Sequence, residues 1–215
     1  MPKVRVAAFG VSLDGFGAGP DQSVENPLGR RGAELHEWFY PTRTFQRMYG
    51  SAEGTTGVDE DFAARSMAGL GAWIFGRNMF GPVRGPWPDE SWKGWWGEEP
   101  PYHVPVFVLT HHRRPPLEMK GGTTFHFVTD GIESALAQAQ EVAGDRDISI
   151  AGGASCARQA IKTGLVDEID LQVSPVILGS GERLFDGFEA GVPKLELVRV
   201  LHAPGVAHLR YAVTR

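Results

Sequence analysis

Short apolar segments alternate with helical segments through most of this 215-residue sequence. The runs of strand length are residues 4–9, 72–75, 106–109, 125–128, 148–150 and 169–173, and helical spacing of apolar residues predicts helices over 33–39, 59–70, 132–142 and 157–161. Strands joined by helices pair in parallel, because each crossover returns the chain to the end of the sheet where the previous strand began. The alternation therefore predicts an α/β fold with a mostly parallel sheet.

The C-terminal part of the chain follows a different pattern. Residues 195–201 and 207–213 have strand character, and they flank Ala203-Pro204-Gly205, which is typical of a turn. We expect this pair to form an antiparallel hairpin at the edge of the sheet. With the hairpin, the sheet is predicted to have eight strands.

One domain is predicted for residues 1–215, because a chain of this length can bury one core and shows no internal repeat. Residues 81–105 are unusual, since they mix proline and glycine with Trp87, Trp92, Trp95 and Trp96. We interpret this segment as an insertion in the domain. It could be a lid over a flat heterocycle, a contact between subunits or a satellite core, and we favour packing or subunit contact over catalysis.

The amino-acid composition of the chain limits the classes of function that we expect for it. The net charge of -5 and the lack of a basic stripe argue against nucleic-acid binding, which needs clustered Lys and Arg. A single cysteine, Cys156, excludes an internal disulfide and suits a reducing compartment. The N-terminus does not resemble a signal peptide, and no apolar run approaches the length of a membrane span. We expect a cytoplasmic protein without membrane contact.

Two loops follow predicted strands and have the composition of anion sites. Gly76-Arg77-Asn78-Met79 places a cation after a glycine, and Ala151-Gly152-Gly153-Ala154-Ser155 places paired glycines and a hydroxyl before a helix. Ligands of α/β sheets bind beyond the carboxyl ends of strands, where helix N-termini offer free amides to phosphates. A tight turn without a ligand is the alternative interpretation of the glycine pair.

A third strand end carries a basic cluster. Leu109, Thr110, His111 and Arg113 belong to a segment that offers a hydroxyl followed by basic side chains. Such a cluster could bind a 2′-phosphate and thereby select NADPH over NADH, although a solvated loop would look the same. The two adjacent histidines lack the companion ligands of a metal site, so we predict no metal.

In their order along the chain, these segments resemble the dihydrofolate reductase superfamily. The resemblance rests on residues 76–79, 109–110, 127–129 and 150–155, with residues 11–16 near the start and residues 175–181 late in the chain. It covers nearly the whole sequence and is closest to the reductase domain of bacterial riboflavin biosynthesis and its stand-alone relatives. It implies a three-layer α/β/α fold and an NADPH-dependent reductase that transfers a hydride to a riboflavin-pathway aminopyrimidine or a pterin- or folate-like ring.

The resemblance also implies roles for residues. The cofactor-binding set would be Gly76, Arg77, Asn78, Met79, Leu109, Thr110, His111, Arg113, Ala151, Gly152, Gly153, Ala154 and Ser155, with Ala8 against the nicotinamide. A carboxylate on the first helix would orient the substrate and assist proton transfer, and Glu34 is nearer to the family position than Glu37. Asp14 and the loop Gly179-Ser180-Gly181 are candidate substrate contacts, although both are also ordinary turn chemistry.

Three other possibilities stay open. A true dihydrofolate reductase is the variant within the same class. A non-catalytic nucleotide- or flavin-binding protein on the same fold would keep the cofactor cleft without a productive substrate site, and an interaction module that uses the Trp-rich insertion would have no nucleotide affinity. For the reductase we expect a homodimer that binds a small heterocyclic substrate.

Overall fold

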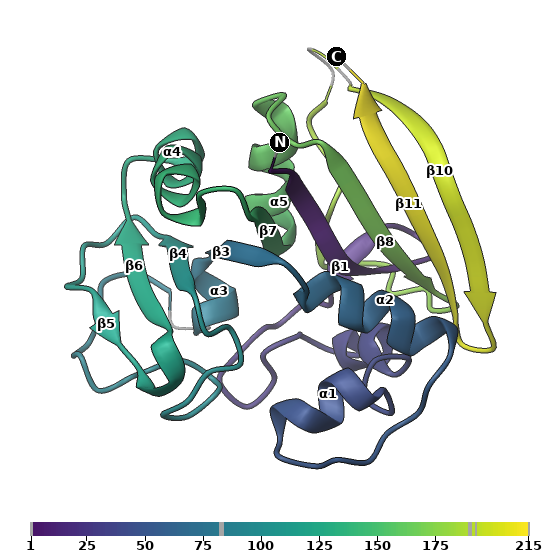
Figure 1. Cartoon of the computed structure of the whole chain (residues 1–215), viewed down its shortest axis with the longest axis horizontal. Coiled ribbons are helices and arrows are strands. Elements are labelled where there is room, and N and C mark those ends of the chain that lie inside the picture. Colours follow the sequence, from purple (N-terminus) through teal and green to yellow (C-terminus); the bar gives the residue numbers. More distant parts are fainter. Residues whose placement is uncertain (1, 82–83, 189–190, 192, 215) are drawn as a thin grey trace.

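Nine strands form one twisted sheet in the computed structural model, which describes residues 2–81, 84–188, 191 and 193–214 (Figure 1). In spatial order they are β10 (Lys194–Ala203), β11 (Val206–Thr214), β8 (Glu168–Ser174), β1 (Val4–Ser12), β7 (Asp147–Gly152), β3 (Leu70–Gly76), β4 (Pro105–Leu109), β6 (Thr124–Val128) and β5 (Leu117–Glu118). Two further strands, β2 (Phe16–Ala18) and β9 (Glu182–Arg183), pair separately.

The pairing pattern confirms the predicted fold class. From β8 through β1, β7, β3 and β4 to β6, every neighbouring pair is parallel. The C-terminal hairpin of β10 and β11 is antiparallel and joins the sheet through β8. The strand beyond the predicted eight is β5, which pairs antiparallel with β6 and is too short for a hydrophobic pattern to predict.

The helices cover both faces of the sheet. They are α1 (Arg43–Met48), α2 (Val58–Met67), α3 (Arg77–Phe80), α4 (Ile132–Ala143) and α5 (Ala154–Lys162), with short 3₁₀ segments η1 (Gly32–His36) and η2 (Lys120–Gly122). Figure 1 shows α4 and α5 on one side of the sheet and α1 and α2 on the other, which confirms the three-layer arrangement. No helix within the described ranges is long and apolar enough to cross a membrane.

Close packing of α4 on the sheet depends on small residues. Ala135 and Ala139 of α4 are fully buried against the core. Gly71 of β3 comes so close to the end of this helix that an added Cβ would lie 2.6 Å from the Cα of Ala143. A larger residue at either surface would push helix and sheet apart, at a cost of roughly 1–3 kcal/mol.

Two helical predictions need correction. The helix expected over residues 33–39 is the shorter 3₁₀ segment η1, and the chain then begins a new helix, α1, directly after Pro41. The side chain of Thr42 caps α1 by accepting a hydrogen bond from the amide of Phe45. The helix expected over residues 59–70 ends at Met67, because Leu70 already belongs to β3.

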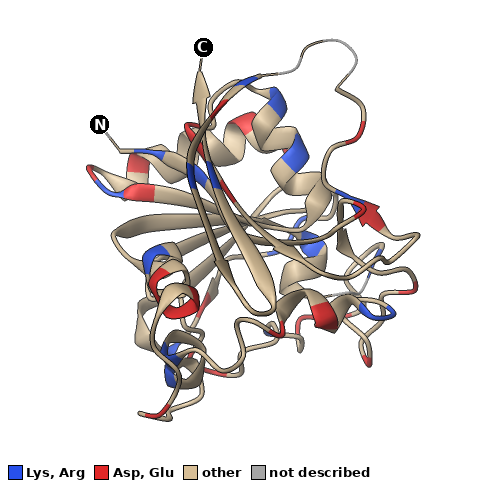
Figure 2. Ribbon diagram, turned by 90° about the vertical axis from the view of Figure 1, so that its right-hand side faces the viewer, with Lys and Arg blue, Asp and Glu red and all other residues tan. Residues whose placement is uncertain are grey.

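Charged contacts attach α2 to the sheet. Arg65 of α2 pairs with Glu168 and Asp170 of β8, and Arg210 of β11 donates to Asp170 at 2.8 Å. The fully buried His208 lies 2.6 Å from the carboxylate of Asp59. In the view of Figure 2, Lys and Arg are interspersed with Asp and Glu along the ribbon.

The Trp-rich segment packs onto the core although its described residues 84–104 form no helix or strand. Trp87, Trp92 and Trp96 lie against the cluster that contains Phe80. The indole of Trp92 donates to the carbonyl of Phe80 at 2.9 Å, and Arg114 donates to the Trp92 carbonyl at 2.6 Å. Pro82 and Val83 of the predicted insertion lie outside the described residues. The assignment of residues 1–215 to one domain stays a prediction.

Candidate functional site

A cavity of about 1000 Å³ lies along β1 and at the carboxyl ends of β3, β4, β6 and β7. Parallel strands place these ends at one edge of the sheet, so loops far apart in the sequence meet there. Nearly all the residues predicted to bind a cofactor line this cavity: Ala8, Gly76, Arg77, Asn78, Met79, Leu109, Thr110, His111, Ala151, Gly152, Gly153, Ala154 and Ser155. The exposed Arg113 lies outside the lining.

We call the part of the cavity formed by residues 76–79, 109–112, 128–131 and 151–156 the loop half. The first turn of α5 belongs to it, and Gly153, the residue before that helix, offers no side chain to cap the free amides. An added Cβ at Gly153 would meet no atom within 4 Å, so the space before the helix is open. An anion can therefore reach the positive end of the helix.

A second helix begins at the same half. Gly131, which precedes α4, lines the cavity and has a φ of 92°, a left-handed conformation that favours glycine. It too provides no side-chain cap. Two uncapped helix N-termini thus contribute partial positive charge to the loop half.

Arg77 adds a full positive charge. Its Nη1 donates to Thr110 Oγ1 at 3.2 Å and to the Gly85 carbonyl at 3.3 Å, and its guanidinium lies 3.2 Å from the ring centroid of Trp87. Desolvation and the nearby Arg114 lower the pKa of Arg77 to about 10, so the group stays charged at neutral pH. Its Nε and Nη2 are buried without a hydrogen-bond partner among the described residues, which leaves two donors unused.

Ala8 lies on the part of β1 that lines the cavity. Its φ of 50° is left-handed, and the register between β1 and β8 shifts between Val6 and Phe9. A left-handed alanine costs about 1–2 kcal/mol, so the surrounding strands must enforce this bulge. The bulge lies among the residues of β1 that line the cavity, from Ala7 to Gly10.

Aromatic side chains line another part of the cavity, which we call the aromatic half. Its aromatic members are Phe9, Trp38, Phe39, Tyr40, Phe45, Tyr49, Trp73, Trp95, Trp96 and Tyr102. The ring of Phe45 lies 5.1 Å from Phe39 and 5.0 Å from Tyr49, and Tyr49 lies 5.8 Å from Trp96. Trp95 and Trp96 belong to the Trp-rich segment, so this segment forms part of the wall, as the lid interpretation expects.

His36 contributes its imidazole ring to the lining of the aromatic half. It is half-buried and lies beside β1, where an added Cβ at Gly10 would come within 3.3 Å of its Cε1. Desolvation lowers the pKa of His36 to about 4, so the ring is neutral at pH 7. Sequence reasoning missed His36, because no neighbouring ligand or motif distinguishes it.

Glu34, the predicted catalytic carboxylate, lies outside the cavity lining. Its two oxygens accept from Arg31 Nε at 2.8 Å and Arg31 Nη2 at 2.9 Å, and this pairing lowers its pKa. The reason is local geometry: η1 is a tight 3₁₀ turn rather than the expected α-helix, and it presents His36 to the cavity instead. The exposed Glu37 is also absent from the lining.

The predicted substrate contacts are brought together, but outside the cavity lining. Asp14 accepts from the amides of Leu178 at 3.1 Å and Gly179 at 2.7 Å. Gly181 packs so tightly that an added Cβ would lie 2.1 Å from the Ala18 carbonyl. Asp14, Gly179, Ser180 and Gly181 therefore form a turn that fastens this loop near β2, and the next residue, Glu182, is the one that lines the cavity.

Cys156 lines the loop half but is buried, and desolvation raises the pKa of its thiol to about 12. It is therefore a poor nucleophile at neutral pH. Across the described ranges, no group of three His, Cys, Asp or Glu is placed to hold a metal ion. The chemistry that the cavity supports is therefore anion binding in one half and ring binding in the other.

Comparisons with known proteins agree with this fold. The RibD C-terminal domain family matches residues 2–209. A structure described as a candidate riboflavin biosynthesis protein from Shewanella sp. PV-4 is similar over 100% of both chains, with a TM-score of 0.62 and 21% identity. A pyrimidine reductase-like protein from Corynebacterium diphtheriae has a TM-score of 0.55 and 17% identity over 100% of this chain and 92% of its own.

A two-activity enzyme is also similar. It is the diaminohydroxyphosphoribosylaminopyrimidine deaminase/5-amino-6-(5-phosphoribosylamino)uracil reductase from Thermotoga maritima, with a TM-score of 0.56 and 14% identity. The similarity covers 99% of this chain but 57% of that enzyme, so this chain spans little more than half of it. No curated protein matches the sequence significantly.

Proposed function

The chain belongs to the RibD C-terminal domain family, and from this we propose that it is an NADPH-dependent reductase that transfers a hydride to a small heterocycle of the riboflavin-pathway or pterin type. The observation that carries the proposal is one continuous cavity with an anion-binding loop half and a ring-binding aromatic half. Its volume of about 1000 Å³ is at the upper end of the usual range for small-molecule sites.

The loop half fits the phosphates of a dinucleotide. Under the proposal, the first turn of α5 holds the pyrophosphate, because its amides are free and Gly153 leaves the approach open. Arg77 holds the 2′-phosphate, since its Nε and Nη2 have no hydrogen-bond partner in the part of the chain that the structure describes. Thr110 orients Arg77 by accepting from its Nη1.

NADPH supplies the hydride, and the protein supplies position and surroundings. Ala8, at the bulge of β1, is where the nicotinamide would lie, because this bulge falls within the part of β1 that lines the cavity. The aromatic walls exclude water from the acceptor ring. His36 is neutral and offers one ring N–H and one bare nitrogen, so it can hydrogen-bond a carbonyl or imine of the acceptor.

The expected homodimer stays a prediction. The edge strand β10 exposes Leu195, Leu197, Val198 and Val200, each between 42% and 55% accessible, and unpaired strand edges of this kind favour association. Sedimentation velocity of the purified protein would test it, since a monomer at micromolar concentration contradicts it.

The enzyme and the non-catalytic binder differ in one measurement. We expect absorbance of NADPH to fall when the protein is mixed with NADPH and a panel of pterins, aminopyrimidines and flavins. Tight NADPH binding without oxidation by any member of the panel would favour the binding protein. No binding of NADPH would contradict the proposed function.

A further inference from the structure

No charged side chain lines the aromatic half among the described residues. The other residues of this half are Ala7, Ala8, Gly10, His36, Met48, Ser66, Met67 and Pro101. The cavity does contain arginines, but Arg77 belongs to the loop half, and Arg158 lies on α5, the helix whose first turn forms that half. Arg84 pairs with Glu182 at 3.7 Å, and their side chains are 63% and 41% exposed.

The polar groups of the aromatic half are neutral at pH 7. His36 has its pKa lowered to about 4 by burial, and burial raises the pKa of the Tyr102 phenol. The Ser66 hydroxyl already donates to the Ala63 carbonyl at 2.7 Å. An anionic group on a substrate would therefore find no opposite charge in this half.

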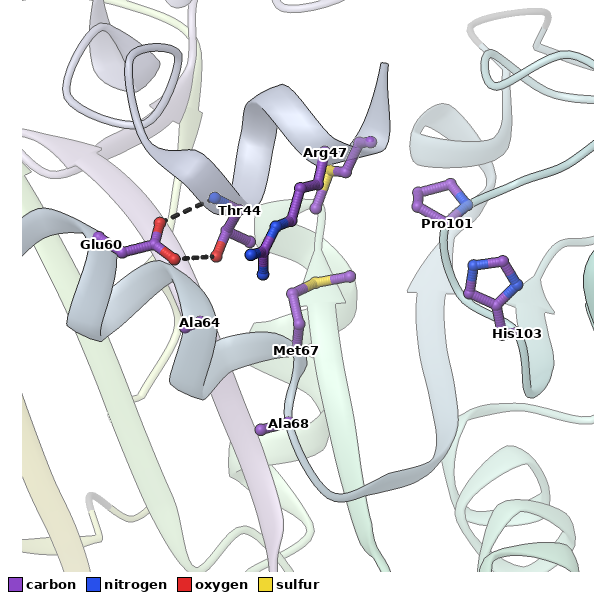
Figure 3. Close-up of a pocket in the computed structure, with 9 residues that line it drawn as sticks. Thr44, Arg47, Glu60, Ala64, Met67, Ala68, Pro101 and His103 are labelled. Carbon is purple, nitrogen blue, oxygen red and sulfur yellow. Dashed lines mark hydrogen bonds between the residues drawn. The ribbon is translucent and has the colours of Figure 1, made fainter. Parts of the chain in front are cut away.

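Apolar residues separate the basic side chains of a neighbouring cavity from the aromatic half. A smaller cavity of about 340 Å³ adjoins it, and Arg47 and His103 line that cavity (Figure 3). Met48, Met67 and Pro101 line both cavities, so these apolar residues separate the two spaces.

The smaller cavity also holds a carboxylate. Glu60 accepts from the Thr44 amide at 2.8 Å and from Thr44 Oγ1 at 3.0 Å, and Figure 3 shows the Arg47 guanidinium on the same side of Met67 as this pair. Arg47 therefore shares its surroundings with a negative charge. It is not a free cation that faces the aromatic half.

We propose that the aromatic half takes an uncharged, planar conjugated ring without a phosphate or carboxylate substituent, and this inference rests on the proposed function. Stacking on the aromatic walls stabilises a flat ring, with pairs worth about 0.5–1.5 kcal/mol beyond their buried area. An unpaired anion in the same place loses its hydration without compensation. Among reductase substrates, the site therefore selects free heterocycles over phosphorylated ones.

Two matched ligand pairs test this selection. Riboflavin and riboflavin phosphate share one ring, and pterin and pterin-6-carboxylate share another, so each pair differs only in an anionic group. Calorimetric titration of the full-length protein saturated with NADP⁺ is expected to give a dissociation constant at least tenfold lower for the uncharged member of one or both pairs. Equal or tighter binding of the anionic members, or no binding of any of the four, overturns the proposal.

A substitution at the C-terminal end of α1 would add a positive charge to the aromatic half. Tyr49 lines the aromatic half and is 66% exposed, so Tyr49→Arg introduces a cation there with little effect on folding. We expect this variant to bind riboflavin phosphate at least tenfold more tightly than the unmodified protein does. Unchanged discrimination between the pair members would contradict the electrostatic basis of the selection.

Arg47→Gln is the control on the same helix, since Arg47 faces the smaller cavity. It should leave the ratio between pair members unchanged, whereas loss of riboflavin phosphate binding in this variant would show that Arg47 serves the ring site. Failure of the proposed function is visible separately, because it would appear as absent binding of NADPH in the unmodified protein.

Discussion

The two halves of the cavity are built by different means. In the loop half, the backbone forms most of the binding surface: glycines leave space for a ligand, and two helix N-termini present free amides. In the aromatic half, side chains form the binding surface. Trp38, Tyr49 and Trp96 of this surface come from segments outside the sheet. The comparison suggests that the loop half follows from the fold itself, whereas the aromatic half carries the specificity of this chain.

The largest effect is expected at the loop half. Gly153→Val places a branched side chain in the open space before α5, where it would exclude a phosphate. NADPH affinity should fall roughly hundredfold, equivalent to about 2.8 kcal/mol. Fluorescence titration measures the affinity, and thermal unfolding of the same sample checks the fold.

Gly205→Ala is a control for this substitution, because an added Cβ there also meets no atom within 4 Å and the residue lies in the turn after β10. It should bind NADPH as the unmodified protein does. If Gly153→Val also keeps its affinity, the loop half is not the phosphate site.

Arg77→Ala should have the next largest effect. The unpartnered Nε and Nη2 of Arg77 suit a 2′-phosphate, so the variant should lose about tenfold or more in NADPH affinity and much less in NADH affinity. Titration with both cofactors measures the ratio. Arg113→Ala is the matched control, since this exposed arginine lies outside the lining, and an equal loss in both variants would contradict the assignment to Arg77.

Trp96→Ala tests the other half. Loss of the ring that packs 5.8 Å from Tyr49 should weaken an acceptor ring by about 1–2 kcal/mol and leave NADPH affinity within about twofold. Steady-state kinetics would show this as a higher KM for the acceptor at constant cofactor affinity. A parallel loss of NADPH affinity would mean that the halves are not separable.

The smallest effect concerns pH. The folded-state pKa of His36, about 4, lies below its ordinary value of 6.5, so the unfolded chain binds more protons between these values. Stability contributed by neutral His36 is therefore complete above about pH 6.5 and is lost as the pH falls toward 4. Chemical denaturation at several pH values should show a weaker pH dependence for His36→Gln, and an identical dependence would contradict its burial.

The loop half could be predicted from the sequence because its signals are local. Apolar runs that end at Gly76 and Gly152 identify strand ends, and parallel strands bring their carboxyl ends to one edge of the sheet. The same reasoning found Arg77 and Thr110. It also selected Arg113, which lies outside the cavity lining, because the sequence of a loop does not show in which direction a basic side chain points.

The aromatic half could not be predicted in this way. Its walls come from residues 38–49, from β3 and from residues 95–102, and only the tertiary structure brings them together. His36 rather than Glu34 faces the cavity because η1 is a 3₁₀ segment and not an α-helix. The apolar pattern of only five residues does not distinguish these two kinds of helix. Thr42 did carry a usable signal, since threonine is a preferred residue at the N-cap of a helix.

The most direct test of the central claim is titration of the purified protein with NADPH and with NADH, followed by the fluorescence of its six tryptophans. Trp38, Trp73, Trp95 and Trp96 line the cavity and should report its occupancy. We predict micromolar binding of NADPH with a clear preference over NADH. Absence of binding to either cofactor, or tighter binding of NADH, would contradict the assignment of the loop half to NADPH.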